Sequence, residues 1–428
     1  MALGDRVKLV TRSKEEFEGI LMPCSPDLFV LKLKSGYNMN FDKKNVSSLK
    51  ILSKVQKKKK TLKKISSSAS KRITLLHTGG TIASSLDYQS GAVSSLFHPE
   101  DLLSLFPELN SLAKIDSRLV CNMFSEDLRF DHYNLLVKEI EKEVKKGVNG
   151  VIVSTGTDTL HYTSAALAFA LENLAIPVLV VGAQRSSDRG SSDAALNLLS
   201  AAYYIVESCF TGVAVCMHWH SDDALCAVLP ACKVRKLHSS RRDAFRPVNA
   251  EVLAFVDYHH KKIEQIAPLP SLSGSFKVHL FNPKLKIGLL KTHTHMFPEE
   301  FSSYASFDGL VLEGSGLGLM PLHVTDRATT VHKKIAESLK SLIKKEVVVV
   351  MSSQCLFGRV HLDVYSKGRD IQSLGVIGHL NDMTPETSFI KLAWLLSNYK
   401  KKEEVKRLFM ENLRGELSER SLFDGEFV

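Results

Sequence analysis

Between residues 72 and 217 the sequence repeats one pattern, in which a short apolar run is followed by a helical segment. In the segment YNLLVKEIEKEV, Leu136, Ile140 and Val144 recur every four residues, as on the buried face of a helix. Strands that are apolar throughout are buried on both faces, so the pattern predicts an α/β, doubly wound fold with a parallel sheet between helices. The expected strands are RITLLH (72–77), GVIVS (150–154), IPVLVVG (176–182) and GVAVCM (212–217).

The same pattern returns after IAPLPSLSGSF (266–276), a segment rich in proline, serine and glycine that is typical of a connection between domains. LKIGLL, GLVLE and EVVVVM are expected strands, and helices are expected after Pro298, around Ile335 and from Pro385. We therefore expect two α/β domains, over residues 71–270 and 284–428.

A different pattern occupies residues 1–53. Short alternating runs, among them GDRVKLV, FEGILMP and LFVLKLKSG, predict a small, SH3-like β-barrel domain of about five strands. Residues 54–70 contain KKKKTLKK followed by SSSAS, which cannot bury a core and is typical of a solvated linker. These lysines supply most of the net charge of +10, and no aromatic residues are interleaved to stack on bases, so a tether is favoured over an RNA-binding stripe.

Composition also bears on the compartment. No run of eighteen apolar residues occurs, and residues 1–14 lack the apolar middle of a secretory signal, so we expect a cytoplasmic protein without a membrane span. Seven scattered cysteines with no CxxC pair predict reduced thiols, interpreted as packing residues. His293 and His295 form an HxH pair with no third ligand at suitable spacing, so no metal site is expected.

Hydroxyl groups and charges gather just past the expected strands, where doubly wound sheets bind ligands. Residues 78–81 (TGGT) follow the first strand, residues 155–159 (TGTDT) follow the second, and Lys236 lies further on in KVRKLHSSRRDAF. The chain has no GxxxxGK[ST] motif, and Leu319 replaces the third glycine of GxGxxG in GSGLGLM, which argues against nucleotide binding. Taken alone, TGGT favours a tight turn, and Lys236 a solvated lysine in a basic stretch.

Together, HTGGTIAS, STGTDTL and the downstream lysine resemble the L-asparaginase and glutaminase family. The resemblance implies Thr81 as the nucleophile and Tyr88, in DYQSGAV, as its polarising neighbour. It implies Thr157, Lys236 and Asp158 as a second hydroxyl, a base and an orienting carboxylate. Amide hydrolysis by acyl transfer needs such a nucleophile and base, with donors for the oxyanion. Burial favours a neutral amine and an adjacent carboxylate favours an ammonium, so the resting charge of Lys236 stays open.

The resemblance also implies substrate-binding residues. Ser125 and Glu126 in MFSEDL are similar to the pair that holds the α-carboxylate and α-amino groups, although in isolation they favour a helix cap. Gly80 lets the backbone approach the substrate closely, and Ala183 falls where the family backbone contacts the departing amide. Asp193 with Asn197 is interpreted as a cap of the following helix.

Nearly the whole chain is similar to the GatD family, the amidohydrolase subunits of archaeal-type glutamyl-tRNA(Gln) amidotransferases. About seventy residues precede TGGT, and QRSSDRGSSDAALNL, LEGSGLGL and MTPETSFIKLAWLL agree as well. Departures are Gly190 in place of proline, Leu160 in place of a frequent methionine, and the lysine linker.

This second resemblance implies a glutaminase that passes ammonia to a partner protein, GatE. The partner would bind Glu-tRNA(Gln) and use ATP and Mg²⁺, while this chain binds no cofactor. A homodimer joined to two partner copies is expected, with Tyr88 ordered in the assembled complex. The alternatives are a freestanding L-asparaginase or glutaminase with an appended barrel, and a non-catalytic RNA-associated module.

Overall fold

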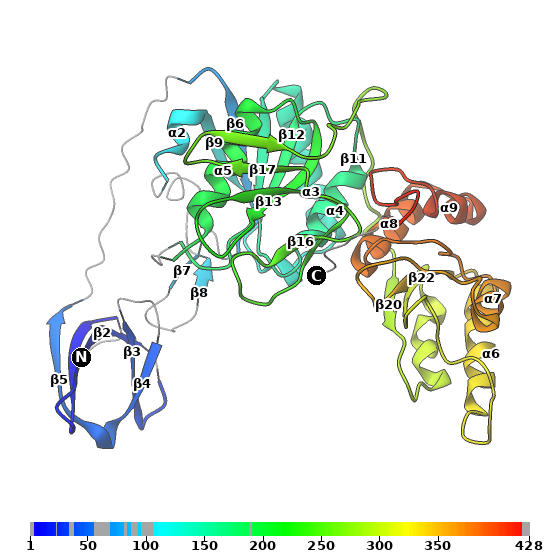
Figure 1. Cartoon of the computed structure of the whole chain (residues 1–428), viewed down its shortest axis with the longest axis horizontal. Coiled ribbons are helices and arrows are strands. Elements are labelled where there is room, and N and C mark those ends of the chain that lie inside the picture. The colour runs from blue at the N-terminus through cyan, green and yellow to red at the C-terminus, as the bar shows by residue number, and fades with distance from the viewer. Residues whose placement is uncertain are drawn as a thin grey trace.

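The computed structural model describes residues 4–22, 24–33, 38–54, 69–80, 84–86, 93–95, 106–187 and 191–421 (Figure 1). Thr81, Tyr88, Gly190 and most of the 54–70 segment lie outside the described residues. No helix of the described ranges is long and apolar enough to cross a membrane.

The N-terminal strands form a five-stranded antiparallel sheet in the order β4-β3-β2-β1-β5, which curls on itself in Figure 1. Alternate side chains point inward and form a small core around Val7, Leu9 and Leu31. The predicted small β domain is therefore present. Its strands are β1 (Arg6–Thr11), β2 (Glu16–Met22), β3 (Leu28–Leu33), β4 (Asn38–Asp42) and β5 (Val46–Ser53), with a 3₁₀ turn, η1, at Lys43–Asn45.

An eight-stranded sheet follows, in the order β18-β17-β14-β13-β12-β10-β6-β9. Neighbours from β9 to β13 pair in parallel, as predicted, whereas β14, β17 and β18 pair antiparallel, so the expectation of a purely parallel sheet was wrong. Residues 219–225 between β13 and β14 are too few for a parallel crossover. The strands are β6 (Arg72–His77), β9 (Lys114–Leu119), β10 (Gly150–Ser154), β12 (Pro177–Val181), β13 (Gly212–His218), β14 (Cys226–Pro230), β17 (Ala254–Asp257) and β18 (Lys262–Gln265).

Helices cover both faces of this sheet. Side chains of alternate parity along β6 and β10 enter two different cores: Leu76 and Val151 pack with α3 (Phe130–Lys145) and α4 (Leu160–Ala170), whereas Ile73 and Ile152 pack with α5 (Ala194–Glu207) and α2 (Leu109–Leu112). The doubly wound α/β prediction is confirmed.

The C-terminal part contains a three-stranded parallel sheet of β20 (Ile287–Lys291), β21 (Gly309–Gly314) and β22 (Val348–Ser353). The helix expected after Pro298 is instead a 3₁₀ segment, η4, at Pro298–Ser306. The expected helix at Pro385 is present, because Thr384 accepts a hydrogen bond from the Thr387 amide and proline fits the first turn. The helices are α6 (Val331–Lys344), α7 (Ser366–Ser373), α8 (Pro385–Asn398) and α9 (Lys402–Phe409).

Helix α8 joins the two α/β parts. Trp394 on α8 packs against Phe169 on α4, with ring centroids 5.6 Å apart, and both belong to one continuous hydrophobic core. Three short pairings complete the description: β11 (Leu171–Glu172) with β19 (Lys277–Val278), β15 (Val234–Lys236) with β16 (Phe245–Pro247), and β7 (Ser84–Leu86) with β8 (Val93–Ser95).

The seven cysteines are free thiols, as predicted, but their interpretation as packing residues was only partly right. Cys216, Cys226 and Cys232 are buried. Four others do not fill the core: Cys24, Cys209 and Cys355 are exposed, and Cys121 is half-buried.

Candidate active site

The carboxyl ends of three adjacent parallel strands form the floor of the candidate site. In register, His77 at the end of β6 pairs with Ser154 of β10, which pairs with Val181 of β12. The segments that follow these strands therefore leave the sheet side by side. Two of them carry the hydroxyl motifs that the sequence singled out.

His77 and Ser154 bind the first two segments together. The His77 Nδ1 atom lies 2.6 Å from Ser154 Oγ, and the Thr78 amide donates to the Ser154 carbonyl at 3.0 Å. Burial lowers the pKa of His77 to about 4, so the ring is neutral near pH 7. His77 is thus an uncharged structural link beneath the site.

The glycines of TGGT allow an unusually close approach between the two motifs. Gly80 has φ +81°, and a Cβ added there would lie 2.5 Å from the Gly156 nitrogen. Gly79 has φ +100°, and its Cβ would lie 2.5 Å from the Met123 carbonyl oxygen. Side chains do not tolerate such contacts, and positive φ favours glycine. The residue before Thr81 therefore lies against the residue before Thr157.

Thr157, Asp158 and Lys236 form one hydrogen-bonded group. Lys236, at the end of β15, donates through Nζ to Thr157 Oγ1 at 2.9 Å and to Asp158 Oδ1 at 2.7 Å. The Lys236 side chain is 8% exposed and the Asp158 side chain 68% exposed, so the ion pair runs from the buried hydroxyl to the surface. Because Thr157 Oγ1 accepts from Lys236, its own proton is directed elsewhere.

That proton points toward a residue that the sequence analysis missed. Thr157 Oγ1 donates to Gln184 Oε1 at 3.4 Å, and the buried Gln184 Nε2 atom has no hydrogen-bond partner among the residues that the structure describes. Gln184 directly follows Ala183 in the segment after β12, which is the signal that could have identified it. Both ends of its amide thus face the candidate site or its wall.

Lys236 does not lie in a solvated basic stretch. Its cationic neighbours are each paired with an acid, so that alternative was wrong for this segment. The pairs are Lys233 with Asp382 at 2.7 Å, Arg235 with Glu386 at 2.9 Å, Arg241 with Asp243 at 2.6 Å and Arg242 with Asp223 at 2.7 Å.

Ser125 and Glu126 lie beside the second motif, in the 3₁₀ turn η3 (Ser125–Asp127). A Cβ on Gly156 would lie 2.9 Å from Ser125 Cβ, and the Thr159 amide donates to Ser125 Oγ at 3.3 Å. The first residue flanking α3 is Arg129, so Ser125 does not cap that helix. Both Ser125 and Glu126 line a cavity of about 440 Å³ that extends toward the C-terminal part of the chain.

Ala183 is fully buried and begins a segment held by Asp193. The Gln184 amide donates to Asp193 at 3.0 Å, as does the Arg185 amide. Asp193 occupies the N-cap position of α5, yet its side chain accepts no helix amide, so the interpretation as a cap was wrong. The carboxylate instead fixes the preceding segment, because two loop amides point at it.

The HxH pair takes part in local contacts. His293 Nε2 lies 2.9 Å from Glu300 Oε2, and the His295 ring packs edge-on against Phe297. Within the part of the chain that the structure describes, no group of three or more His, Cys, Asp and Glu side chains could hold a metal ion.

Three family models match the chain over most of its length. They are "Asparaginase, N-terminal" at residues 72–268, "Glutaminase/Asparaginase C-terminal domain" at residues 286–409 and "GatD N-terminal domain" at residues 1–52. Among curated proteins, the glutamyl-tRNA(Gln) amidotransferase GatD of Thermofilum pendens is 38% identical over 99% of this chain and 94% of its own length. The GatD of Pyrococcus furiosus is 38% identical over 97% and 95%.

This chain belongs to the GatD family of glutamyl-tRNA(Gln) amidotransferase subunits. The predicted resemblance is therefore confirmed along nearly the whole chain, including the N-terminal β domain. Its fold is that of the asparaginases: the L-asparaginase of Thermococcus kodakarensis superposes with a TM-score of 0.70 at 28% identity, covering 82% of this chain and all of that one. L-asparaginase I of Vibrio cholerae gives 0.68 at 27%, with the same coverage.

Proposed function

We propose that this member of the GatD family is the glutaminase of a tRNA-dependent amidotransferase. It hydrolyses the side-chain amide of glutamine and supplies ammonia for the conversion of Glu-tRNA(Gln) to Gln-tRNA(Gln). The observation that carries the proposal is the group of Lys236, Thr157 and Asp158, with contacts of 2.9 and 2.7 Å, next to the Gly80 approach. The full-length similarity to GatD proteins supports the tRNA-linked setting.

In the first step the Thr81 hydroxyl attacks the amide carbon of glutamine. The carbon–oxygen bond forms, the carbon–nitrogen bond breaks, and the nitrogen leaves as ammonia with the proton that Thr81 gives up. Backbone amides near Gly80 and Ala183 are suited to the developing oxyanion, because neither position places a bulky side chain before the substrate. Tyr88 polarises the attacking hydroxyl.

In the second step water cleaves the Thr81 ester, releases glutamate and restores the hydroxyl proton. Thr157 and Lys236 hold a hydroxyl and an amine at 2.9 Å, a suitable arrangement for moving the protons of both steps. Asp158 fixes the Lys236 amine through the 2.7 Å ion pair. The same residues thereby serve bond breaking and ester hydrolysis.

Ser125 and Glu126 hold the α-carboxylate and α-amino groups of the substrate. Their support comes from the buried position of Ser125 against Gly156, one residue from Thr157. A hydroxyl donor and a carboxylate match the opposite charges of an amino acid's two α-substituents. Gly80 and Ala183 complete the substrate-binding set.

The partner is GatE, which binds the tRNA and uses ATP and Mg²⁺, while this chain holds neither a metal nor a nucleotide. We propose a homodimer of this chain within a heterotetramer, in the cytoplasm. The lysine-rich segment 54–70 tethers the N-terminal β domain, and nearly all of that segment lies outside the described residues.

Ammonia release from glutamine tests the chemistry. The full chain and its complex with GatE are compared with the Thr81→Ala and Thr157→Ala variants. The proposal expects release by the complex and a large loss in both variants. Release that survives both substitutions contradicts the assignment, and equally fast release by the isolated chain favours a freestanding asparaginase or glutaminase.

A further inference from the structure

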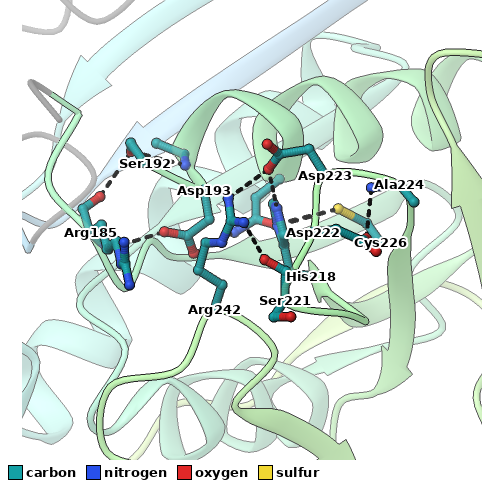
Figure 2. A network of polar contacts seen from close by, with 12 residues as sticks. Arg185, Ser192, Asp193, His218, Ser221, Asp222, Asp223, Ala224, Cys226 and Arg242 are labelled. Carbon is teal, nitrogen blue, oxygen red and sulfur yellow. Dashed lines mark hydrogen bonds and ion pairs between the residues drawn. The ribbon is translucent and has the colours of Figure 1, made fainter. Parts of the chain in front are cut away.

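A polar network lies behind the Ala183–Arg185 segment and connects it to the surface (Figure 2). Asn197 on α5 is its central residue. Its Nδ2 atom donates to the Gly182 carbonyl at 3.0 Å and to Asp193 Oδ2 at 3.2 Å. Both amide protons of Asn197 are therefore used, which fixes the orientation of its side chain and leaves Oδ1 as an acceptor.

His218, at the end of β13, faces an acceptor on each side of its ring. Nδ1 lies 2.6 Å from Asn197 Oδ1, and Nε2 lies 3.1 Å from Asp223 Oδ1. An amide oxygen whose nitrogen is already committed cannot donate, and neither can a carboxylate. Both ring nitrogens of His218 must therefore carry protons, which makes the fully buried ring an imidazolium.

The surroundings of His218 agree with a buried cation. Burial by itself disfavours the charge, but the neighbouring Cys226, Asp223 and Asp193 outweigh it and raise the pKa of His218 above its ordinary 6.5. Cys226 on β14 also lies 3.4 Å from Asn197 Oδ1 through its sulfur. Arg242 binds the far side of Asp223 at 2.7 Å and holds that carboxylate beside the ring.

The network ends at the candidate catalytic hydroxyl. Asp193, which accepts from Asn197, also accepts from the Gln184 amide at 3.0 Å, and Gln184 Oε1 lies 3.4 Å from Thr157 Oγ1. A continuous series of polar contacts thus runs from the exposed Asp223 to Thr157. In Figure 2, Asp193, His218 and Asp223 lie in succession across this part of the chain.

We propose that His218 is a positioning residue of the amidase, acting as an imidazolium that fixes Asn197 and Asp193 and thereby holds the Gln184 segment against Thr157. Loss of the proton leaves one ring nitrogen with its lone pair toward an acceptor, so one of the two contacts is lost. Amide hydrolysis then falls at alkaline pH. The inference rests on the proposed glutaminase function for its catalytic consequence.

The sign of the pH effect follows from the direction of the pKa change. A histidine whose pKa is raised in the folded protein stabilises its network fully below pH 6.5. That contribution disappears as the pH rises through the raised value. Hydrolysis is therefore expected to be intact on the acid side of this titration and to decline on its alkaline side.

The test combines a titration with kinetics on the full chain, in complex with GatE. NMR of ¹⁵N-histidine-labelled protein, with His218 identified by its loss in His218→Gln, follows the protonation of both ring nitrogens. Ammonia release from L-glutamine is measured over the same pH range. We expect a doubly protonated ring at neutral pH and an alkaline decline in kcat that coincides with the His218 titration.

Two surface variants separate positioning from general stability. Asp223 is 61% exposed, so Asp223→Asn should fold, and it removes one acceptor of His218. Asp222→Asn is the matched control, because Asp222 carries the same charge on the same turn but accepts from the Ala224 amide. We expect Asp223→Asn to move the alkaline decline to lower pH and to reduce kcat about tenfold where the wild type begins to decline, the effect of losing one charge-assisted hydrogen bond. Asp222→Asn should match the wild type.

A His218 ring with one proton at pH 6, or an alkaline decline that Asp223→Asn leaves in place, would overturn the proposal. A shift of equal size in Asp222→Asn would overturn it as well, because the effect would then be one of surface charge. If no sample released ammonia, the proposed function and the catalytic consequence would both fail. The NMR titration would still decide whether the buried ring is an imidazolium.

Discussion

Replacement of Thr157 by valine isolates the contribution of one oxygen atom. The Thr157 methyl group packs against Gly182, where an added Cβ would lie 2.7 Å from Cγ2, and valine keeps that methyl. The substitution removes Oγ1 and its contacts with Lys236 and Gln184. Lys236 retains Asp158 at 2.7 Å, so no buried charge is left unpaired.

The expected cost in stability is small beside the expected cost in rate. A typical hydrogen bond contributes about 1 kcal/mol, so Thr157→Val should lower the free energy of unfolding by about 1–2 kcal/mol. Proton transfer by a positioned group contributes about 10²- to 10⁴-fold, equivalent to about 3–5 kcal/mol in the activation free energy. Hydrolysis should therefore fall far more than folding does.

The assay is ammonia release from glutamine by the complex, with urea unfolding of the chain measured in parallel. Thr157→Ser is the matched control, since it restores the hydroxyl without the methyl and should keep activity within about tenfold of the wild type. A folded Thr157→Val protein whose kcat/KM lies within about threefold of the wild type would refute the role assigned to this hydroxyl.

Further substitutions test the packing and pH behaviour derived above. Lys391→Met leaves Glu416 without its 2.5 Å partner in a pair with no exposed surface, and should lower stability by about 3–5 kcal/mol in urea titrations; a change below about 1 kcal/mol would contradict this. Because the pKa of His77 is lowered to about 4, the unfolded chain binds the proton first, and stability should fall as pH drops from 6.5 toward 4. His77→Gln should remove about 3 kcal/mol of that fall in pH-dependent thermal melts, and an unchanged slope would refute the assignment. Gly80→Ala should abolish ammonia release, because its Cβ would meet the Gly156 nitrogen at 2.5 Å; retained activity would exclude the close approach.

Sequence patterns predicted the elements that depend on local periodicity. RITLLH and GVIVS became β6 and β10 with the predicted bounds, because strands buried on both faces show continuous apolar runs. Strand direction was less accessible. The antiparallel β14, β17 and β18 are also apolar in part, and what distinguishes β14 is the short connection from β13.

The site divides in the same way. Family motifs indicated Thr157, Asp158 and Lys236, and these lie within hydrogen-bonding distance although 78 or 79 residues separate the lysine from the others. Gln184 and His218 were missed, because their contacts arise where separate strand ends meet and leave no periodicity in the sequence. Asp193 was noticed but given the wrong role, since a helix-cap position does not reveal which amides a side chain accepts.

The most direct measurement of the central claim is glutamine-dependent amidation of Glu-tRNA(Gln), with the purified chain added to or omitted from its partner GatE, ATP and Mg²⁺. The account predicts Gln-tRNA(Gln) formation when both proteins are present, and loss of glutamine use when the chain carries Thr157→Val. Free ammonium should restore amidation in that variant, because the partner's chemistry is untouched. Glutamine-dependent amidation that persists with the Thr157→Val chain would contradict the account.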